Sequence, residues 1–208
     1  KILICDRKVA FTGGVGIADE WEGDSYGPSQ WRDTHFKIMG PAVSAIFSGF
    51  VENWQECGRK ISDLIDVNRA NPKTSYGESA VQVLRSPAAY GWSDFTTLIR
   101  LIISIAKSRI NITTAYFNPD KATSELLIEA VRRGVKVNIL VPGQHTDKKI
   151  AKIAGEAKYG PLLEAGVRVF HYQRTMLHAK VITIDKTLAC VGSPNFNQRS
   201  MRKDDELG

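Results

Sequence analysis

The two ends of this 208-residue chain carry the same pattern of residues, and this repeat limits the folds that the chain can adopt. The shared positions are a lysine, an aspartate five residues later and a glycine seven residues after the aspartate: Lys1, Asp6 and Gly13 in the first copy, and Lys180, Asp185 and Gly192 in the second. Similar small and apolar residues stand between the aspartate and the glycine, VAF in the first copy and LAC in the second. Such a duplication predicts two similar half-domains, each contributing one copy of the motif to a shared site.

The second copy adds a histidine two residues before its lysine, in the stretch HAKVITID. Side chains two apart on a strand point to the same face, so His178 and Lys180 can reach one ligand together. A neutral imidazole is a good nucleophile or acid/base near pH 7, and an ammonium is a compact charge for a phosphate oxygen. Asp185 stands seven positions from His178 and points to the opposite face of a regular strand. We therefore expect Asp185, and Asp6 in the first copy, to orient a strand end and its turn.

The sequence GSPN (192–195) follows the second motif and can bring more polar groups to the same pocket. The hydroxyl of Ser193 and the amide of Asn195 are suited to hydrogen bonding there. The first copy has Gly16 at the position that matches Asn195. Chance alone gives H-x-K-x4-D in about one or two sequences per hundred of this composition, so a single copy would be only suggestive. The second half-motif, with its glycine, favours a functional site over coincidence.

Strand and helix patterns alternate along most of the chain. Strands are predicted at 1–5, 8–12, 31–40, 81–85, 109–117, 135–141, 167–172, 178–184 and 187–192, and helices at 41–57, 93–108, 121–133 and 147–165. This alternation predicts an α/β fold with helices on both faces of a sheet. The stretch 66–80 is polar and without period, so we predict a connector between two parts, 1–65 and 81–208.

Composition narrows the partners of the chain without choosing one. A net charge of +6 and a pI near 9.2 fit a phosphate-bearing partner, either nucleic acid or anionic lipid, and fit an ordinary soluble basic protein equally well. The three cysteines form no CxxC pair, which argues against a disulfide framework or a zinc site. No segment reaches the roughly 18 apolar residues of a membrane span. Because the chain opens on Lys, we interpret it as a piece of a longer protein.

Together, HAKVITID and GSPN resemble the signature of the phospholipase D superfamily, H-x-K-x4-D followed by G-[GS]-x-N. Other stretches are similar to its bacterial cardiolipin synthase-like branch, and the similarity covers nearly all of 1–60 and 80–206: KVAFTGGVGIADEW, WRDTHFKIMGPAV, AYFNPD, RRGVKVNILVPG, YGPLLEAGVRVFHY and TMLHAKV. The resemblance implies a phospholipase D-like fold, a mixed β-sheet flanked by helices in two pseudo-symmetric halves, the first of them truncated. The first motif departs from the pattern, because its histidine would stand two residues before Lys1 and Gly16 replaces the usual Asn.

The resemblance also implies a chemistry, a two-step phosphodiester exchange through a phosphohistidine, without metal or other cofactor. The family's nucleophile is generally the histidine of the first motif, so His178 is expected to be the general acid and base. Lys1 and Lys180 are expected to hold the non-bridging phosphate oxygens and offset charge in the transition state. Asp33 and Glu206 match the family's carboxylates that orient the two imidazoles; their alternative interpretation is ordinary surface charge. With one histidine missing, this piece alone is expected to be inactive.

Three functions remain open at this stage. The first is a phosphatidyltransferase or phospholipase D acting on anionic glycerophospholipid at a membrane surface, on its cytoplasmic side or in the cytoplasm. The second is a nuclease of the same superfamily, whose basic surface follows a DNA backbone. The third is a remnant that binds phosphate groups without turnover. The synthase-like stretches favour lipid, because many superfamily nucleases carry one motif and dimerise. Tyr116 and Phe117 end a predicted strand near the expected pocket and are either lining or core aromatics.

Overall fold

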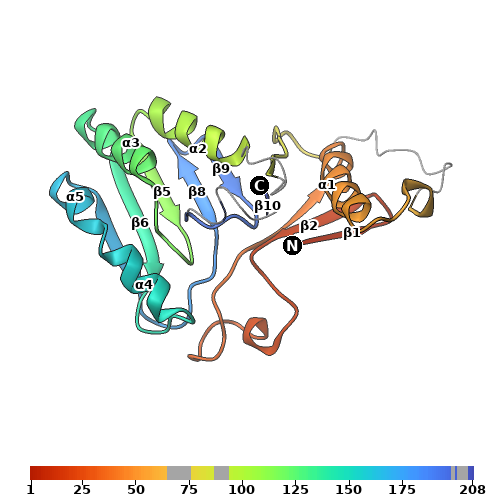
Figure 1. Cartoon of the computed structure of the whole chain (residues 1–208), viewed down its shortest axis with the longest axis horizontal. Coiled ribbons are helices and arrows are strands. Elements are labelled where there is room, and N and C mark those ends of the chain that lie inside the picture. Colours follow the sequence, from red (N-terminus) through yellow and green to blue (C-terminus); the bar gives the residue numbers. More distant parts are fainter. Residues whose placement is uncertain (65–75, 87–93, 198–199, 201–205) are drawn as a thin grey trace.

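The computed structural model describes residues 1–64, 76–86, 94–197, 200 and 206–208 (Figure 1). The strands in these ranges are β1 (Ile2–Cys5), β2 (Val9–Gly13), β3 (His35–Met39), β4 (Arg85–Ser86), β5 (Arg109–Thr113), β6 (Lys136–Pro142), β7 (Arg168–Tyr172), β8 (Val181–Ile184), β9 (Leu188–Val191) and β10 (Glu206–Leu207). The α-helices are α1 (Ala42–Glu56), α2 (Asp94–Ile105), α3 (Lys121–Arg132), α4 (Lys149–Glu156) and α5 (Tyr159–Glu164), and short 3-10 turns are η1 (Asp19–Trp21) and η2 (Ile61–Asp63). Most of the predicted connector, 66–80, lies outside the described residues. Within them, no helix is both long and apolar enough to span a bilayer.

The N-terminal part is a three-stranded antiparallel sheet, in the order β1-β2-β3, with α1 packed against it. Alternate residues of the strands point toward the helix, as a period of two requires. Val43 and Ile46 of α1 are fully buried against Ala10, and the half-buried Ile2 and Ile4 pack on the same cluster. The predicted helix at 41–57 is confirmed, and the predicted strand at 31–40 is shortened to β3.

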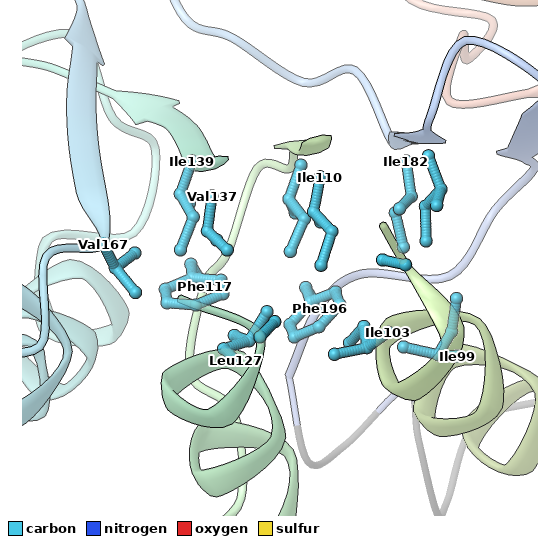
Figure 2. Close-up of a cluster of buried hydrophobic side chains, with 14 of the residues drawn as sticks. Ile99, Ile103, Ile110, Phe117, Leu127, Val137, Ile139, Val167, Ile182 and Phe196 are labelled. Carbon is cyan, nitrogen blue, oxygen red and sulfur yellow. The ribbon is translucent and has the colours of Figure 1, made fainter. Parts of the chain in front are cut away.

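The C-terminal part is a five-stranded mixed sheet in the order β7-β6-β5-β8-β9. Strands β5, β6 and β7 run parallel, whereas β8 is antiparallel to β5 and to β9. One face of this sheet carries the main core, where apolar side chains of the strands meet those of α2, α3 and α5 (Figure 2). Phe117 belongs to this core and is 3% exposed, so its interpretation as a core aromatic is the right one.

The opposite face of the five-stranded sheet is polar at its centre. Asn138 donates to Asn111 (2.8 Å), and Asn111 donates to Thr183 (3.2 Å). These residues alternate with the core residues along their strands. In the part of the chain that the structure describes, α2, α3 and α5 contribute to the core on the other face. These three helices cover one face only, so they do not meet the prediction of helices on both faces. That prediction relied on the alternation of strands and helices, which does not reveal the polar ladder.

The predicted helix at 147–165 is two helices, α4 and α5, separated at residues 157–158. Pro161 explains the position of the break. Within a continuous helix its ring would clash with the carbonyl of Ala157, and it has no N–H to donate there. In the first turn of a new helix neither condition matters, so α5 begins at Tyr159.

The sequence repeat is also a repeat of backbone geometry. The β1–β2 and β8–β9 hairpins turn through paired left-handed residues: Asp6 (φ 52°) and Arg7 (54°), and Asp185 (52°) and Lys186 (61°). Each turn is closed by one hydrogen bond, Lys8 N to Cys5 O and Thr187 N to Ile184 O, both 3.0 Å. Two left-handed residues fit the right-handed twist of a hairpin, and aspartate tolerates this conformation better than most residues do. The aspartate of each motif copy therefore lies in a hairpin turn of the same backbone conformation.

Candidate active site

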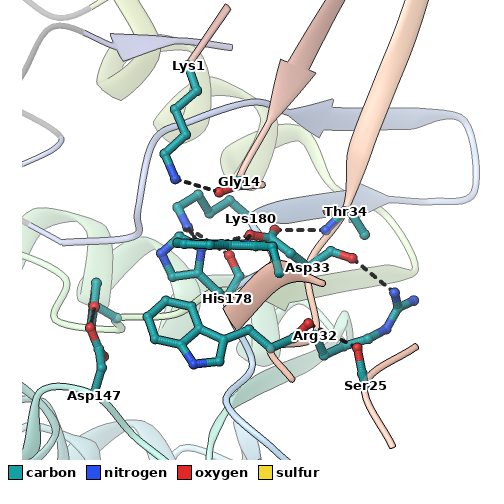
Figure 3. A network of polar contacts seen from close by, with 12 residues as sticks. Lys1, Gly14, Ser25, Arg32, Asp33, Thr34, Asp147, His178 and Lys180 are labelled. Atoms are coloured by element: carbon teal, nitrogen blue, oxygen red, sulfur yellow. Dashed lines mark hydrogen bonds and ion pairs between the residues drawn. The ribbon is translucent and has the colours of Figure 1, made fainter. Parts of the chain in front are cut away.

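The candidate site lies where the two parts of the chain meet, at the edge of the five-stranded sheet where β5, β6 and β7 end (Figures 1 and 3). Strand β8 begins at this edge, because Val181 is paired with Thr113, the last residue of β5. His178 and Lys180 lie in the segment that leads into β8, so the observed strand begins later than predicted. His178 N donates to Arg32 O (2.7 Å), and this bond joins the segment to the N-terminal part. Carboxyl ends of parallel strands are the usual place for a ligand in such sheets.

Asp33 holds the imidazole of His178. Its Oδ2 lies 2.7 Å from His178 Nδ1, and the two side chains are 2% and 12% exposed. Because a carboxylate can only accept, Nδ1 carries the proton and Nε2 is left to exchange protons with a substrate. Burial lowers the pKa of His178, while the hydrogen bond that Nδ1 donates to Asp33 acts to raise it. The imidazole is therefore oriented and kept neutral at pH 7.

Lys180 packs against the same ring. Its Nζ lies 3.1 Å from Nδ1 and 3.2 Å from Nε2 of His178, and it donates to the carbonyl oxygen of His178 at 2.7 Å. The residue is 7% exposed. Burial lowers the pKa of Lys180 to about 8, and the negative charges of Asp33 and Glu206 oppose this shift. A bound phosphate would favour the charged ammonium.

Lys1 reaches this cluster from the other half. Its Nζ donates to Gly14 O (2.9 Å) and lies 4.4 Å from the centre of the Trp21 ring. The charge of Lys1 contributes to lowering the pKa values of both His178 and Lys180, which shows that the three groups share one electrostatic environment. Figure 3 shows the two lysine side chains converging beside the imidazole. The site thus combines one imidazole and two ammonium groups.

Glu206 occupies the position in the second half that Asp33 occupies in the first. Gly14 N donates to Thr34 O (3.1 Å), and Ser193 N donates in the same way to Leu207 O (3.0 Å). The hydroxyl of Ser193 also donates to the carboxylate of Glu206. A pocket of about 210 Å³ contains Ser193 and Glu206 together with Lys1. Among the described residues, Asn195 Oδ1 is buried without a hydrogen-bond partner.

The two turn aspartates lie away from the cluster. Asp185 accepts from the backbone N–H groups of Lys107 (2.8 Å), Ser108 (2.8 Å) and Arg109 (2.9 Å). These bonds lower the pKa of Asp185 far below its usual range. The carboxylate joins the start of β5 to the β8–β9 turn, at the opposite end of β8 from His178. This is the orienting position that its odd spacing predicts, and Asp6 lies in the matching turn of β1–β2.

A family model described as "Cardiolipin synthase, PLD-like domain" matches residues 99–208, more than half of the chain. The chain belongs to this PLD-like domain family. Cardiolipin synthase A of Pseudomonas fluorescens is 35% identical over 209 residues, and cardiolipin synthase 1 of Bacillus cereus is 32% identical over 213. Each match covers 100% of this chain and 42% of the relative, so the chain spans less than half of their length.

Solved structures agree with the fold of this PLD-like domain. The phospholipase D family member Nuc from Salmonella typhimurium superposes with a TM-score of 0.51 at 26% identity, covering 62% of this chain and 79% of Nuc. Phosphatidylserine synthase of Haemophilus influenzae gives a TM-score of 0.65 at 16% identity, covering 97% of this chain and 55% of that protein. The second likeness extends over both parts of the chain, which confirms the phospholipase D-like architecture.

Two tryptophans of the N-terminal part lie beside the site and were not among the predicted site residues. The ring centres of Trp21 and Trp31 lie 5.4 and 5.2 Å from that of His178, and 4.7 Å from each other. Both lie in the segment between β2 and β3. No hydrophobic period places Trp21, and Trp31 was assigned to the predicted strand at 31–40, whereas β3 begins only at His35. Large aromatic residues in a glycine-rich loop were the available signal, since binding residues are concentrated on loops.

The loop after β6 contributes a further carboxylate. Tyr116 donates to Asp147 at 2.5 Å, and the charge of Asp147 acts to raise the pKa of Lys180. Burial and this hydrogen bond raise the pKa of Tyr116, so its hydroxyl stays protonated. Tyr116 is therefore near the site, and its neighbour Phe117 is in the core. This contact depends on how two loops meet, which a single sequence does not reveal.

Proposed function

We propose that this chain supplies the acid/base half of the active site of a phospholipase D-superfamily phosphatidyltransferase. The observation that carries the proposal is the hydrogen bond from His178 Nδ1 to Asp33, made beside two converging lysines. A buried carboxylate that fixes an imidazole, with ammonium groups next to the free nitrogen, suits a phosphodiester anion. The cardiolipin synthase relatives favour a glycerophospholipid as the substrate.

In the first step of the proposed reaction, a nucleophilic histidine attacks phosphorus. This histidine is proposed to belong to the first motif and to precede Lys1 in the full-length protein. A P–N bond forms, the P–O bond to the leaving alcohol breaks, and Nε2 of His178 gives its proton to the departing oxygen. Lys1 and Lys180 offset the charge on the non-bridging oxygens. The nearby carboxylate of Glu206 is proposed to orient the nucleophilic histidine, as Asp33 orients His178.

In the second step, an acceptor alcohol or water attacks the phosphohistidine. Nε2 of His178 removes the proton from the attacking oxygen, a new P–O bond forms, and the P–N bond breaks. The lowered pKa of His178 suits the base of this step. A bound phosphodiester brings negative charge close to the imidazole and raises its pKa, which loads the proton needed for the first step. Substrate binding and protonation are thus coupled.

We also propose that the substrate is met at an anionic bilayer. Helix α4 follows the loop that carries Asp147, so it stands at the same sheet edge as the site. Its outer surface exposes Ile150 (85%) and Ile153 (65%), and the exposed Lys148 and Lys149 precede them. Apolar side chains flanked by lysines are typical of surfaces that lie in the interface of anionic lipid. A DNA backbone would use the lysines but not the isoleucines.

The membrane part of the proposal is tested by vesicle sedimentation of the full-length protein. Replacing Ile150 and Ile153 by Glu should weaken binding to phosphatidylglycerol vesicles by about tenfold, since apolar insertion is lost and repulsion is added. Leu101→Glu is the matched control, because Leu101 is 53% exposed on α2, outside the site. Equal losses for both variants would contradict the α4 surface.

The reaction itself is tested by assaying the full-length protein on phosphatidylglycerol and on plasmid DNA in parallel. Lipid turnover that disappears in His178→Gln supports the proposal. DNA cleavage without lipid turnover would favour the nuclease alternative. If a phosphorylated headgroup binds and neither substrate is turned over, the non-catalytic alternative holds.

A further inference from the structure

A tryptophan side chain occupies the space beside Gly16, the position where the second motif has Asn195. A Cβ atom added to Gly16 would lie 2.9 Å from Lys1 Nζ and 2.9 and 3.0 Å from Cζ3 and Cη2 of Trp21. Such approaches are shorter than carbon atoms tolerate, so an amide side chain at Gly16 requires the indole and the ammonium to move. The glycine and the tryptophan therefore form a complementary pair.

The indole N–H of Trp21 reaches the carboxylate that holds the catalytic imidazole. Trp21 Nε1 donates to Asp33 Oδ2 at 2.9 Å, and the same oxygen accepts from His178 Nδ1 at 2.7 Å. The other oxygen, Oδ1, accepts from Thr34 N at 2.7 Å. With donors on both oxygens, Asp33 is fixed in one rotamer, and its negative charge is shared between the indole and the imidazole.

The ring of Trp21 contacts two further groups of the site. Its face lies under the Lys1 ammonium, at 4.4 Å from Nζ to the ring centre. Its plane meets that of His178 at 82°, an edge-to-face arrangement with centres 5.4 Å apart. One side chain thus contacts a phosphate-binding lysine, the orienting carboxylate and the imidazole. The 3-10 turn η1, closed by Trp21 N to Ala18 O at 3.1 Å, holds it there.

We propose that Trp21 is a positioning residue that compensates for the missing amide at Gly16. It holds the Lys1 ammonium with its ring face and fixes Asp33 with its N–H, so that one residue sets both the charge and the orientation of the imidazole. The activity consequences rest on the proposed phosphatidyl transfer, whereas the effect on His178 is measured without substrate.

The first test is an NMR titration of His178 in histidine-labelled protein, with its signal assigned by comparison with His178→Gln. Trp21→Phe keeps a ring but removes the N–H. The full charge of Asp33 then acts on the imidazole, and the smaller ring admits water, so both changes raise the pKa of His178. We expect a rise of about half a unit to one unit. Trp54→Phe is the control, since Trp54 also donates its N–H, to Lys60 O at 3.2 Å, far from the site.

The second test is the coupling between Gly16 and Trp21. Gly16→Asn alone should lower kcat/KM in the full-length protein, because it displaces Lys1 and Trp21 together. Trp21→Phe removes the two indole carbons that Cβ of residue 16 would meet, and leaves Lys1 Nζ, which stands at the end of a flexible side chain. The double variant should therefore exceed the product of the two single effects by roughly three- to tenfold, the size expected for residues in contact. Pairing Gly16→Asn with Trp31→Phe should give no such recovery.

An unchanged His178 pKa in a folded Trp21→Phe variant would overturn the proposal, as would additive effects in the double variant. If Trp21→Phe lowers only the thermal midpoint, Trp21 has a structural role and the proposal fails. If wild-type protein turns over no lipid while the His178 pKa still rises, the positioning role stands and the proposed phosphatidyl transfer fails.

Discussion

The two hairpins of the repeat have the same backbone but hold their carboxylates differently. In the first half, the carboxylate of Asp33 fills the space beside Gly14, where an added Cβ would lie 2.2 Å from Oδ1. In the second half the matching residue is Ser193, and its hydroxyl donates to Glu206. The first half thus combines a glycine with an aspartate, and the second half combines a serine with the longer glutamate. Both combinations place a carboxylate next to the same cleft.

The halves also differ in what their carboxylates face. Asp33 reaches across the molecule to His178 of the other half, so this imidazole is oriented by the opposite half. Glu206 lies beside Lys1 in the pocket, where the symmetric histidine is proposed to sit. Duplication therefore fixes the backbone, while the side chains that fill each half are free to diverge. Gly16 and Trp21 are one such divergence.

The largest expected loss of turnover comes from replacing His178, because only this residue is proposed to transfer protons. In the full-length protein, His178→Gln should reduce lipid turnover by about a thousandfold or more, because a proton donor and acceptor is lost. Binding of inorganic phosphate should persist, since Lys1 and Lys180 remain; isothermal titration calorimetry measures it. His171→Gln is the control, because His171 lies on β7 beside Glu156. If labelled phosphate is trapped on His178 of the wild-type protein, the acid and nucleophile roles are reversed.

The next effect compares the two carboxylates directly. Asp33→Asn should lower turnover by roughly 10²- to 10⁴-fold, because an amide can hold the wrong tautomer of His178. It should also lower the pKa of His178 further, since Asp33 raises it in the native site. Glu206→Gln should reduce turnover while leaving that pKa nearly unchanged. NMR titration of both variants decides this, and equal shifts would contradict the division of roles between the halves.

A smaller effect concerns the lysines and pH. The pKa of Lys180 is about 8, so its ammonium is lost as pH rises through that value. Turnover should therefore fall on the alkaline side of pH 8. An arginine at position 180 keeps its charge at every accessible pH, so in Lys180→Arg the alkaline fall in activity should shift to higher pH. The value of kcat/KM should be reduced by about tenfold or more, because the guanidinium is larger. A pH–rate profile tests this; an alkaline limb that stays in place in Lys180→Arg would show that another group titrates.

The sequence predicted the parts of the site that depend on chain-local spacing. His178 and Lys180 meet because they stand two residues apart, and the repeat placed Lys1 opposite them. The resemblance supplied Asp33 and Glu206, which the structure locates beside the cluster. The predicted α/β class and the helices over 41–57 and 121–133 also agree with the structure, since their apolar periods are strong.

Other features depend on loops and on the second face of a sheet. Trp21 comes from an aperiodic loop and Trp31 from a predicted strand that begins later than expected. Asp147 hydrogen-bonds to Tyr116, and its charge acts on Lys180, because two loops meet at one sheet edge. The polar ladder of Asn111, Asn138 and Thr183 was not predicted, because each residue stands singly among apolar residues of its strand. No single-sequence period encodes these contacts, because each partner lies on a different element.

The smallest effect concerns stability and compares the two turn aspartates. Asp185→Asn keeps a residue that tolerates a left-handed backbone, so the change isolates the charge and hydrogen bonds to β5. Asp6→Asn is the matched variant in the other hairpin, whose strand β1 pairs with β2 among the described residues. At pH 7, Asp185→Asn should lower the thermal midpoint by several degrees, and Asp6→Asn measures how much is lost when the same turn position is changed in the first hairpin. Because the native pKa of Asp185 lies below its unfolded value near 4, its stabilisation is present above about pH 4 and is lost as pH falls toward the native value. The gap between wild type and Asp185→Asn should therefore narrow between pH 5 and pH 2 in calorimetric scans, whereas a gap that is constant over this range would show that packing, and not the charge, anchors the turn.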